Sequence, residues 1–555
     1  MRILAGFLFA LALGAQPYDL VIANARLVDG TGSPWRLADL AVRGDRIARI
    51  TPAGLLREAA AARRIDARGL VLAPGFIDIQ GHSREYLLDG DGRVIAKVSQ
   101  GVTTEILGEG TTNAPANEKT SAQAPGSAMT RDKAIRFAGP HGFDEWLRAM
   151  EKHGNSINFG SFIGAGTLRQ YVKGMAQGRL TAAETEEMRR VVRLGMEDGA
   201  FGIASALIYP PDSFQSTEEL VEASKAMAPY GGVYITHIRS EADSLLEAAD
   251  EAMEIGRRGG VPVELYHLKA AGKRNWGKAD ALIEKISAAR AGGLDVQANM
   301  YPYTAGATGL SSCFPPWTAA DGQLFDNLAN PEVRKRIRAE VLSDKTDWEN
   351  MCQLSTPEGV LVLGLNKPEN KQYAGKRLSE IARAMNKDFI DAAMDLVLSE
   401  RQRVGTVYFM MSEENVRKKL QQPWIKIGTD AGGPNPDTKT LVHPRSYGTY
   451  TRILGKYVRQ EKLLTLEEAV RRMTSAVAAR LSIADRGLLR EGLMADLVLF
   501  NPDTVIDRAT FEDPNQVSVG VEHVFVNGAE VWGRGKHTGA KPGRIVRGPG
   551  WAGGR

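Results

Sequence analysis

Cysteine is almost absent from this 555-residue sequence, which contains only Cys313 and Cys352. The pair has neither the close spacing of zinc ligands nor that of a redox motif, so a disulfide framework is excluded as the main source of stability. We expect both cysteines to be packing residues, and a single bridge between them is the alternative interpretation.

An excess of one charge sign is also lacking, because 70 Lys and Arg residues face 66 Asp and Glu residues, for a formal net charge of +4. The basic residues form no long run that would hold phosphates, so neither nucleic acid nor a membrane surface is an expected partner. Apolar residues make up 43% of the chain and charged residues 25%, which is typical of a globular protein. The length predicts one large domain with one or two smaller units.

Long apolar runs are missing except at the N-terminus. There Met1-Arg2 precede an apolar run from Ile3 to Leu13 and then small residues, the order found in a signal peptide, which we place at residues 1–15. The run is shorter than the roughly 20 apolar residues that span a bilayer as a helix. We therefore expect an exported protein, periplasmic or secreted. The alternative is an apolar extension of the strand that begins near Asp19.

Strand-like segments dominate both ends of the chain, and we expect residues 16–70 and 481–555 to form one small β-domain. Between them, over residues 71–480, β-runs alternate with helical stretches, which indicates a parallel sheet of βα units. Eight runs can be counted, the number that closes a barrel. They are Val71 to Ile79, Thr104 to Leu107, Ile157 to Ile163, Phe201 to Ala206, Val233 to Ile238, Val263 to Leu268, Asp295 to Tyr301 and Trp424 to Ile427.

The seventh and eighth runs are much further apart than one βα unit. The excess, at about residues 310–421, predicts an insertion, and helical stretches at 330–342, 378–385 and 389–399 make it a subdomain above the barrel mouth. The predicted fold is therefore α/β: a (β/α)₈ TIM-like barrel with a small β-sandwich domain formed by both chain ends and an insertion after strand 7.

Residues able to bind a metal lie at the ends of five of the eight runs. His237 and His267 lie one βα unit apart, and Glu109, Asp430 and His82 follow three other runs. Each residue alone has an ordinary structural explanation, such as a hydrogen-bonded barrel histidine or a turn aspartate. Side chains at the carboxyl ends of barrel strands converge on one face, however, and imidazoles with carboxylates suit Zn²⁺. Together they predict one hydrolytic metal centre.

The chain contains eight short motifs, and their order and spacing are more specific than any single motif. With them the chain resembles the amidohydrolase superfamily, and within it the N-acyl-D-amino-acid deacylase (D-aminoacylase) family. The motifs are Pro74-Gly75-Phe76-Ile77-Asp78, Gln100-Gly101-Val102-Thr103-Thr104, Thr236-His237-Ile238-Arg239, Tyr266-His267-Leu268-Lys269, Tyr301-Pro302-Tyr303-Thr304-Ala305-Gly306, Gly428-Thr429-Asp430, His443-Pro444-Arg445 and Gly492-Leu493-Met494-Ala495-Asp496-Leu497.

The resemblance implies that His237 and His267 hold a tightly bound zinc ion. The family usually has a cysteine as third ligand where this chain has Glu109, and a carboxylate also binds zinc. A second metal site would consist of His82, Glu109 and Asp430. There the family usually has a His-x-His pair, but this chain reads Gln80-Gly81-His82. We therefore expect one firmly bound zinc and a second site that is weak or empty.

The resemblance also implies hydrolysis of N-acylated D-amino acids, in which zinc activates a water molecule and Asp430 transfers its proton. Arg445, Lys269, Tyr301 and Tyr209 would contact the substrate carboxylate and the scissile amide; for the first two, a solvated surface charge is the alternative. Two other functions stay open: a dipeptidase or cyclic-amide hydrolase of the same superfamily, and a non-catalytic binding protein on a degenerate barrel.

Overall fold

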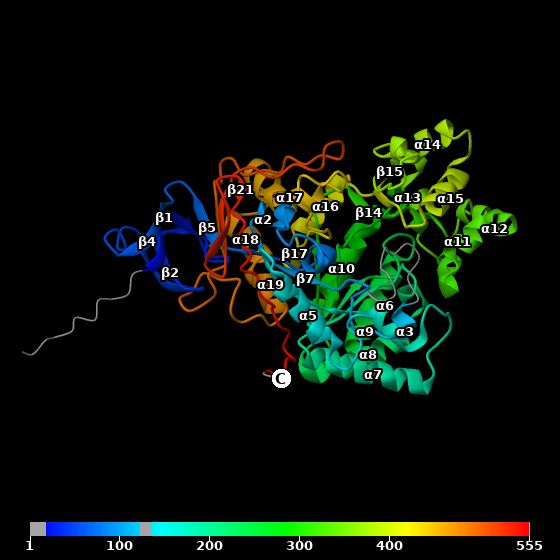
Figure 1. The fold of residues 1–555 in the computed structure, drawn as a ribbon, viewed down its shortest axis with the longest axis horizontal. Coiled ribbons are helices and arrows are strands. Elements are labelled where there is room, and N and C mark those ends of the chain that lie inside the picture. Colours follow the sequence, from blue (N-terminus) through cyan, green and yellow to red (C-terminus); the bar gives the residue numbers. More distant parts are fainter. Residues whose placement is uncertain (1–17, 122–134, 554–555) are drawn as a thin grey trace, which may run out of the picture.

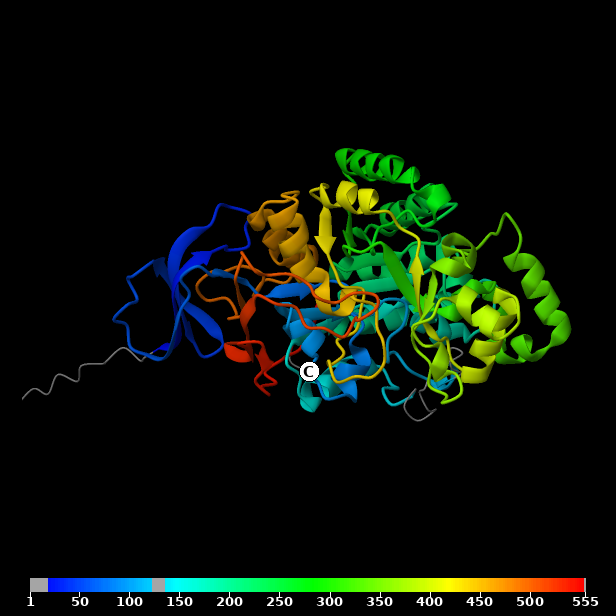
Figure 2. The ribbon, with the colours of Figure 1, turned by 90° about the horizontal axis from the view of Figure 1, so that it is seen from above.

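The computed structural model of the protein describes residues 18–121 and 135–553. The predicted signal peptide, residues 1–15, lies outside the described residues. Three units follow one another along the long axis of the molecule: a small β-domain, the barrel and the insertion (Figures 1 and 2). Within the described part of the chain, no helix is long and apolar enough to cross a membrane.

The small β-domain combines strands from both ends of the chain, as predicted. Its sheet runs in the order β21-β20-β19-β18-β5-β1-β2-β3, and β4 pairs with β1. The strand β5 joins the two halves, because it lies parallel to β1 and antiparallel to β18. The bounds are β1 (Tyr18–Leu27), β2 (Arg36–Arg43), β3 (Arg46–Pro52), β4 (Ala61–Asp66), β5 (Val71–Pro74), β18 (Leu497–Phe500), β19 (Val521–Val526), β20 (Ala529–Gly533) and β21 (Lys536–His537).

The predicted (β/α)₈ barrel is confirmed. All its strand pairs are parallel. Only Phe162 separates β8 from β9, so these two share one strand position, and a parallel bridge between Gly81 and Ala431 closes the ring. In order, the strands are β6 (Phe76–Asp78), β7 (Val102–Leu107), β8 (Asn158–Ser161) with β9 (Ile163–Gly164), β10 (Gly202–Ala206), β11 (Val233–His237), β12 (Val263–Leu265), β13 (Val296–Met300) and β17 (Ile425–Ile427).

Helices surround the barrel, and their inner faces pack with the outer faces of the strands in the largest hydrophobic cluster. Two helices begin at capping boxes, α7 at Thr181 and α8 at Ser216. The bounds are α5 (Gly142–His153), α6 (Ala165–Lys173), α7 (Ala182–Glu197), α8 (Thr217–Met227), α9 (Leu245–Gly259), α10 (Lys278–Ala291), α16 (Glu413–Leu420), α17 (Arg445–Arg452) and α18 (Leu466–Met473).

The first predicted run, Val71 to Ile79, divides into two strands. Its first half is β5 of the small domain and its second half is β6 of the barrel, with Gly75 between them. A Cβ atom at Gly75 would lie 2.2 Å from the side chain of Thr103, so only glycine fits where the chain passes from one unit to the other. Apolar periodicity does not report this division, because both halves are buried.

The insertion forms a separate unit at the far end of the barrel from the small β-domain (Figure 1). Its predicted helices are present, but its limits differ from the expected 310–421. It begins with β14, and α16 packs Val416 and Leu420 into the barrel core rather than into the insertion. Its elements are β14 (Ala305–Gly309), α11 (Leu324–Ala329), α12 (Pro331–Val341), α13 (Met351–Ser355), β15 (Val360–Val362), α14 (Leu378–Ala384), α15 (Phe389–Glu400) and β16 (Gly405–Phe409).

Cys313 and Cys352 form a disulfide, with their Cα atoms 5.0 Å apart. The expectation that both are free packing residues is wrong, and the alternative of a mutual bridge is confirmed. Both residues are buried in the core of the insertion, so the bridge lies within the apolar packing of this unit.

The C-terminal tail closes the barrel at the amino ends of its strands. The amide of Val546 donates to the carbonyl oxygen of Phe159 at 2.7 Å, and the amide of Gly548 donates to that of Gly199 at 2.8 Å. The Val546 side chain packs with residues from inside the barrel. The chemistry predicted at the carboxyl ends therefore lies at the opposite face.

Candidate metal centre

The five predicted metal-binding residues converge at the carboxyl ends of their strands. His237 is the last residue of β11, and the other four lie in the segments just after β6, β7, β12 and β17. They form two overlapping groups whose ligand atoms lie within 4.8 Å of one another. The groups are Glu109 with His237 and His267, and Glu109 with His82 and Asp430.

The first group is compact and largely screened from solvent. Glu109 Oε1 lies 3.4 Å from His237 Nδ1 and 3.3 Å from His267 Nε2. Burial alone would raise the pKa of Glu109, but the charges and hydrogen bonds of the two histidines outweigh it and hold that pKa well below its usual range. Two imidazole nitrogens with one carboxylate oxygen form a zinc donor set, so these residues fit a zinc ion.

The second group is altered by Gln80. His82 Nε2 lies 2.9 Å from Asp430 Oδ1 and 3.3 Å from Glu109 Oε2. Gln80 Nε2 donates to the same Glu109 oxygen at 2.5 Å, while Gln80 Oε1 is buried without a hydrogen-bond partner. An N–H donor thus faces the oxygen that the second metal would need, which makes this donor set poorer than the first.

Sequence reasoning missed Glu241, whose carboxylate faces both histidines of the first group. Its Oε1 lies 3.0 Å from His267 Nδ1 and its Oε2 lies 3.2 Å from His237 Nε2. Lys269 Nζ donates to these two oxygens at 2.7 and 2.6 Å. Burial would raise the pKa of Glu241, but the charges of His237 and Lys269 outweigh burial and hold that pKa below its usual value. The carboxylate is therefore ionised. In the sequence, the only sign of this contact is that Glu241 lies four residues after His237.

Glu349, a residue of the insertion, lies against Glu241. Its Oε1 accepts a hydrogen bond from the backbone amide of Glu241, and its Oε2 is buried without a partner. Burial and the neighbouring charge of Glu241 raise the pKa of Glu349 to about 8. With His237 and Glu241, it forms a third group of potential metal ligands.

Arg445 is held beside Asp430 by the predicted His-Pro-Arg motif. His443 Nδ1 accepts the Arg445 amide at 3.0 Å, and His443 Nε2 lies 2.9 Å from the carbonyl oxygen of Ala305. Arg445 Nη1 then lies 2.6 Å from Asp430 Oδ2. Burial would raise the pKa of Asp430, but Arg445 outweighs it and lowers that pKa.

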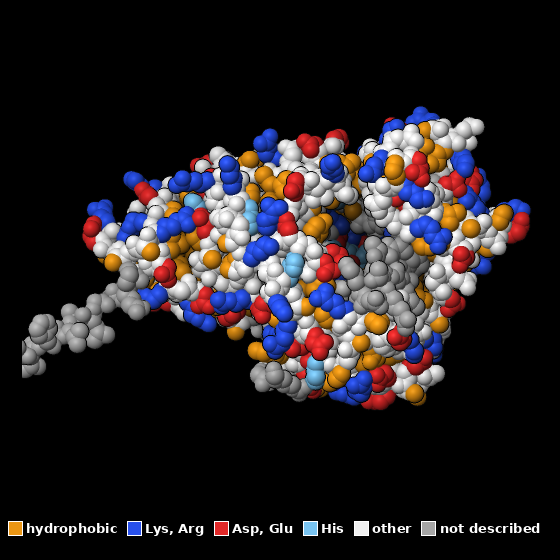
Figure 3. Space-filling view, viewed as in Figure 1, with side chains coloured by type: hydrophobic (Ala, Val, Ile, Leu, Met, Phe, Trp, Pro, Cys, Tyr) orange, Lys and Arg blue, Asp and Glu red, His pale blue; other side chains and the backbone are white. Residues whose placement is uncertain are grey.

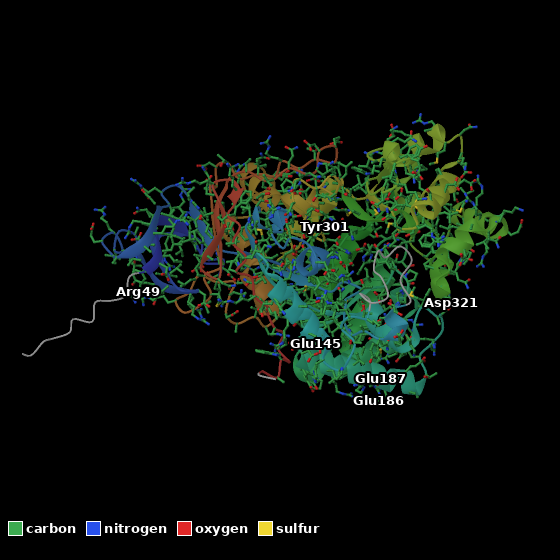
Figure 4. The ribbon with its side chains drawn as sticks, viewed as in Figure 1. Arg49, Glu145, Glu186, Glu187, Tyr301 and Asp321 are labelled. Carbon is green, nitrogen blue, oxygen red and sulfur yellow. A yellow bond between two sulfur atoms is a disulfide. The ribbon has the colours of Figure 1, made fainter. Side chains whose placement is uncertain are left out.

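The surface-charge alternative for Arg445 and Lys269 is wrong, because these side chains are only 6% and 3% exposed. The Arg445 guanidinium lies 4.6 Å and the Lys269 ammonium 5.8 Å from the ring centroid of Tyr301. Tyr301 is labelled in Figure 4. Tyr209 packs edge-on against His237, with ring centroids 5.6 Å apart.

All the predicted site residues line one cavity of about 550 Å³. Its wall is shared between the barrel and the insertion, and Figure 3 shows the surface hollowed at their boundary. The volume lies within the range of small-molecule sites. The arrangement can therefore hold a cation, a general base and a small anionic substrate together.

Two of the site residues adopt strained backbone conformations. The φ angle is 31° at His267 and 50° at Asp430, in the left-handed region that costs non-glycine residues of order 1–3 kcal/mol. Hydrogen bonds hold both: the His267 amide donates to Asn299 Oδ1 at 2.9 Å, and the Asp430 amide donates to the Gln80 carbonyl oxygen at 2.8 Å.

Comparison with known proteins agrees with this geometry. Residues 381–532 match the amidohydrolase family. D-aminoacylase from Alcaligenes xylosoxydans xylosoxydans is 36% identical over 533 residues, which cover 96% of this chain and 98% of that protein. A solved D-aminoacylase structure, from work on one-metal activation and second-metal attenuation of its binuclear centre, has a TM-score of 0.79 at 35% identity and covers 96% of this chain and 100% of that one.

A second enzyme adds a zinc complex. The crystal structure of N-acyl-D-glutamate deacylase from Bordetella bronchiseptica contains zinc and a phosphonate inhibitor that mimics the tetrahedral intermediate. It has a TM-score of 0.79 at 32% identity, and covers 96% of this chain and 100% of that one. Sequence and fold thus agree over nearly the whole length, and the chain belongs to the D-aminoacylase family of amidohydrolases.

Proposed function

We propose that this protein is a zinc-dependent amide hydrolase that releases a carboxylate and a D-amino acid from N-acyl-D-amino acids. The observation that carries the proposal is the buried group of Glu109, His237 and His267 at the mouth of the barrel, in one cavity with Arg445 and Lys269. The similarity to D-aminoacylase and to N-acyl-D-glutamate deacylase supports this substrate class.

We also infer that one zinc ion is held firmly and that the second site is weak. A zinc ion bound by Glu109, His237 and His267 would supply Lewis-acid activation of water and of the amide carbonyl. At the other site the Gln80 amide donates to Glu109, and glutamine provides a poor zinc ligand in place of an imidazole. One-metal activation of D-aminoacylase fits this stoichiometry.

Asp430 is placed to act as the proton carrier. Its pKa is lowered by Arg445, so the carboxylate is ionised at neutral pH and can accept the proton of the attacking water. After attack, the same group delivers that proton to the leaving nitrogen. The Arg445 contact fixes one oxygen of Asp430, which leaves the other, next to His82, for the transfer.

Substrate binding would use the cationic side of the cavity. Arg445 and Lys269 are buried cations near the ring of Tyr301, and a buried cation binds a carboxylate more strongly than an exposed one does. We assign the α-carboxylate of the substrate to these three residues. Tyr209, against His237, would contact the scissile amide.

A substrate screen of the zinc-loaded protein tests the proposal. N-acetyl-D-amino acids, their L-enantiomers, dipeptides and hydantoins would be assayed side by side for amine release or ring opening. We expect turnover of the N-acetyl-D-amino acids well above that of the other classes. Activity confined to cyclic amides or dipeptides would replace the proposed function, and no turnover of any class would favour a binding protein.

Export is a further part of the proposal. The N-terminal residue order suggests a signal peptide, and a disulfide between Cys313 and Cys352 suits an oxidising compartment. Fractionation of cells producing the full-length chain, with the N-terminus of the mature protein sequenced, would test it. A cytoplasmic protein that retains Met1 would contradict export.

A further inference from the structure

Glu241 occupies a central position behind the proposed zinc ligands. It is 1% exposed, and both of its carboxylate oxygens are used. One faces His267 Nδ1, the other faces His237 Nε2, and Lys269 contacts both. It does not belong to the first or the second group of metal ligands.

The two histidines present opposite nitrogens to Glu241. His237 turns Nε2 to Glu241 and Nδ1 to Glu109, whereas His267 turns Nδ1 to Glu241 and Nε2 to Glu109. A neutral imidazole carries one N–H, and an acceptor at one nitrogen fixes the lone pair on the other. Glu241 Oε1 lies within hydrogen-bonding distance of His267 Nδ1, at 3.0 Å, and Lys269 Nζ also approaches this nitrogen, at 2.7 Å. The 3.2 Å contact with His237 Nε2 is not a hydrogen bond, and that nitrogen is buried without a hydrogen-bond partner. The carboxylate therefore contacts both rings on the side away from Glu109, where the zinc would bind, and can hold their orientation.

Glu349 connects this carboxylate to the insertion. It lies just before α13, and it accepts the backbone amide of Glu241 although the two residues are 108 positions apart. The bond is buried, since Glu349 is 7% exposed. Its neighbour Trp348 also lines the cavity. The insertion thus contacts the residue that faces both histidines.

We propose that Glu241 is the positioning residue for the zinc histidines and that Glu349 holds it in place from the insertion. The inference rests on the proposed zinc centre. Carboxylates behind metal-bound histidines set the tautomer and ring orientation, and their loss typically weakens metal binding 10- to 100-fold. Correct docking of the insertion then becomes a condition for tight zinc binding.

A third metal site at His237, Glu241 and Glu349 is the competing explanation of these contacts. The ammonium group of Lys269 argues against it, because it lies 2.6 and 2.7 Å from the two Glu241 oxygens. A cation bound there would have to displace this ammonium group. Hydrogen bonding by Glu349 and metal ligation by Glu349 also predict different behaviour on substitution.

Zinc affinity measured by competition with a chromophoric chelator tests the role of Glu241. Glu241→Gln should raise the zinc dissociation constant about 10- to 100-fold, because a neutral amide replaces the carboxylate that faces both rings. Glu251→Gln is the matched control, since the described contacts of Glu251 are with Arg239 and Thr217. Its zinc affinity should equal that of the wild type. The visible spectrum of the Co²⁺-substituted protein should change only in the Glu241 variant.

Two substitutions at Glu349 separate the explanations and do not depend on the folding of the Glu241 variant. Glu349→Gln keeps a carbonyl oxygen for the Glu241 amide and should retain wild-type zinc affinity. Glu349→Ala removes the acceptor and should weaken zinc binding roughly 3- to 10-fold, the worth of one buried hydrogen bond.

The outcomes are distinct. Equal loss of zinc in both Glu349 variants would show that Glu349 ligates metal and would overturn the proposal. A Glu241→Gln protein that folds and binds zinc like the wild type would also overturn it. Failure of the wild type itself to bind zinc would instead contradict the proposed metal centre.

Discussion

At the scale of single residues, the proposal of one firmly bound zinc depends on Gln80. Its amide nitrogen donates to the Glu109 oxygen that also faces His82. The neighbouring contacts of His82 with Asp430 and Glu109 raise the pKa of His82 to about 9, although burial opposes the shift. A cation there would have to displace the amide hydrogen bond between Gln80 and Glu109.

Replacing Gln80 by histidine should restore the second site. We expect the Gln80→His protein to retain close to two zinc ions per chain after dialysis, where the wild type retains one, because an imidazole lone pair replaces an amide donor. Elemental analysis measures this directly. Gln80→Leu is the control, since it removes the hydrogen bond without adding a ligand and should retain one zinc. Two zinc ions in the dialysed wild type would refute the argument.

Asp430 is the second residue with a testable role. Asp430→Asn should lower kcat by roughly 10²- to 10⁴-fold, the usual contribution of general acid–base catalysis, because an amide cannot accept the proton. The proposed metal ligands Glu109, His237 and His267 remain, so zinc content should be unchanged. Near-normal turnover in a zinc-loaded Asp430→Asn protein would exclude the proton-carrier role.

The sequence predicts the residues that converge as potential metal ligands but not the residues behind them. His237, His267 and Asp430 lie at or just after strand ends, and the strand ends of a barrel converge whatever the conformation of the loops. Glu241 could not be assigned, because its role depends on how the segment after β11 turns toward Lys269. The contact between Glu349 and Glu241 is even harder to predict from sequence, because it forms only when the insertion is folded.

At the scale of secondary-structure elements, strands and helix starts are more predictable than the limits of units. Capping boxes and apolar periodicity locate α7 and α8 because these signals are local. The end of the insertion is not local: α16 belongs to the barrel because Val416 and Leu420 pack into its core. Likewise, nothing in the order of residues after β21 indicates that the tail returns to the barrel.

The tail gives a prediction about stability that is separate from activity. Val546 is 6% exposed and packs inside the amino end of the barrel. Val546→Ala should reduce the free energy of unfolding by about 1–3 kcal/mol through lost burial and a cavity, with kcat/KM unchanged because the site lies at the opposite end. Thermal melting and a substrate assay measure the two quantities.

A matched control for the tail is Leu55→Ala, since Leu55 is 70% exposed and its truncation should leave the melting temperature within error. A Val546→Ala protein as stable as this control would mean that the tail does not close the barrel in solution. A loss of activity equal to the loss of stability would contradict the separation of the two ends.

At the scale of the whole molecule, the cavity belongs to two units with separate cores. The barrel contributes the proposed metal ligands, and the insertion contributes Trp348, Glu349 and Met351 to the same wall. The barrel core and the insertion core are distinct clusters. The folding of each unit therefore draws on its own apolar burial, and the metal centre lies at their boundary.

This arrangement predicts that the fold survives removal of the metal. The barrel core contains dozens of buried apolar residues, whereas a bound ion present at 100 times its dissociation constant adds about 2.7 kcal/mol. Dialysis against a chelator should abolish turnover, leave the far-ultraviolet circular dichroism unchanged and lower the melting temperature by no more than roughly 10 °C. One equivalent of zinc should then restore full activity, and a second should add none. Unfolding on zinc removal would show that the ion, rather than apolar packing, holds the barrel and the insertion together.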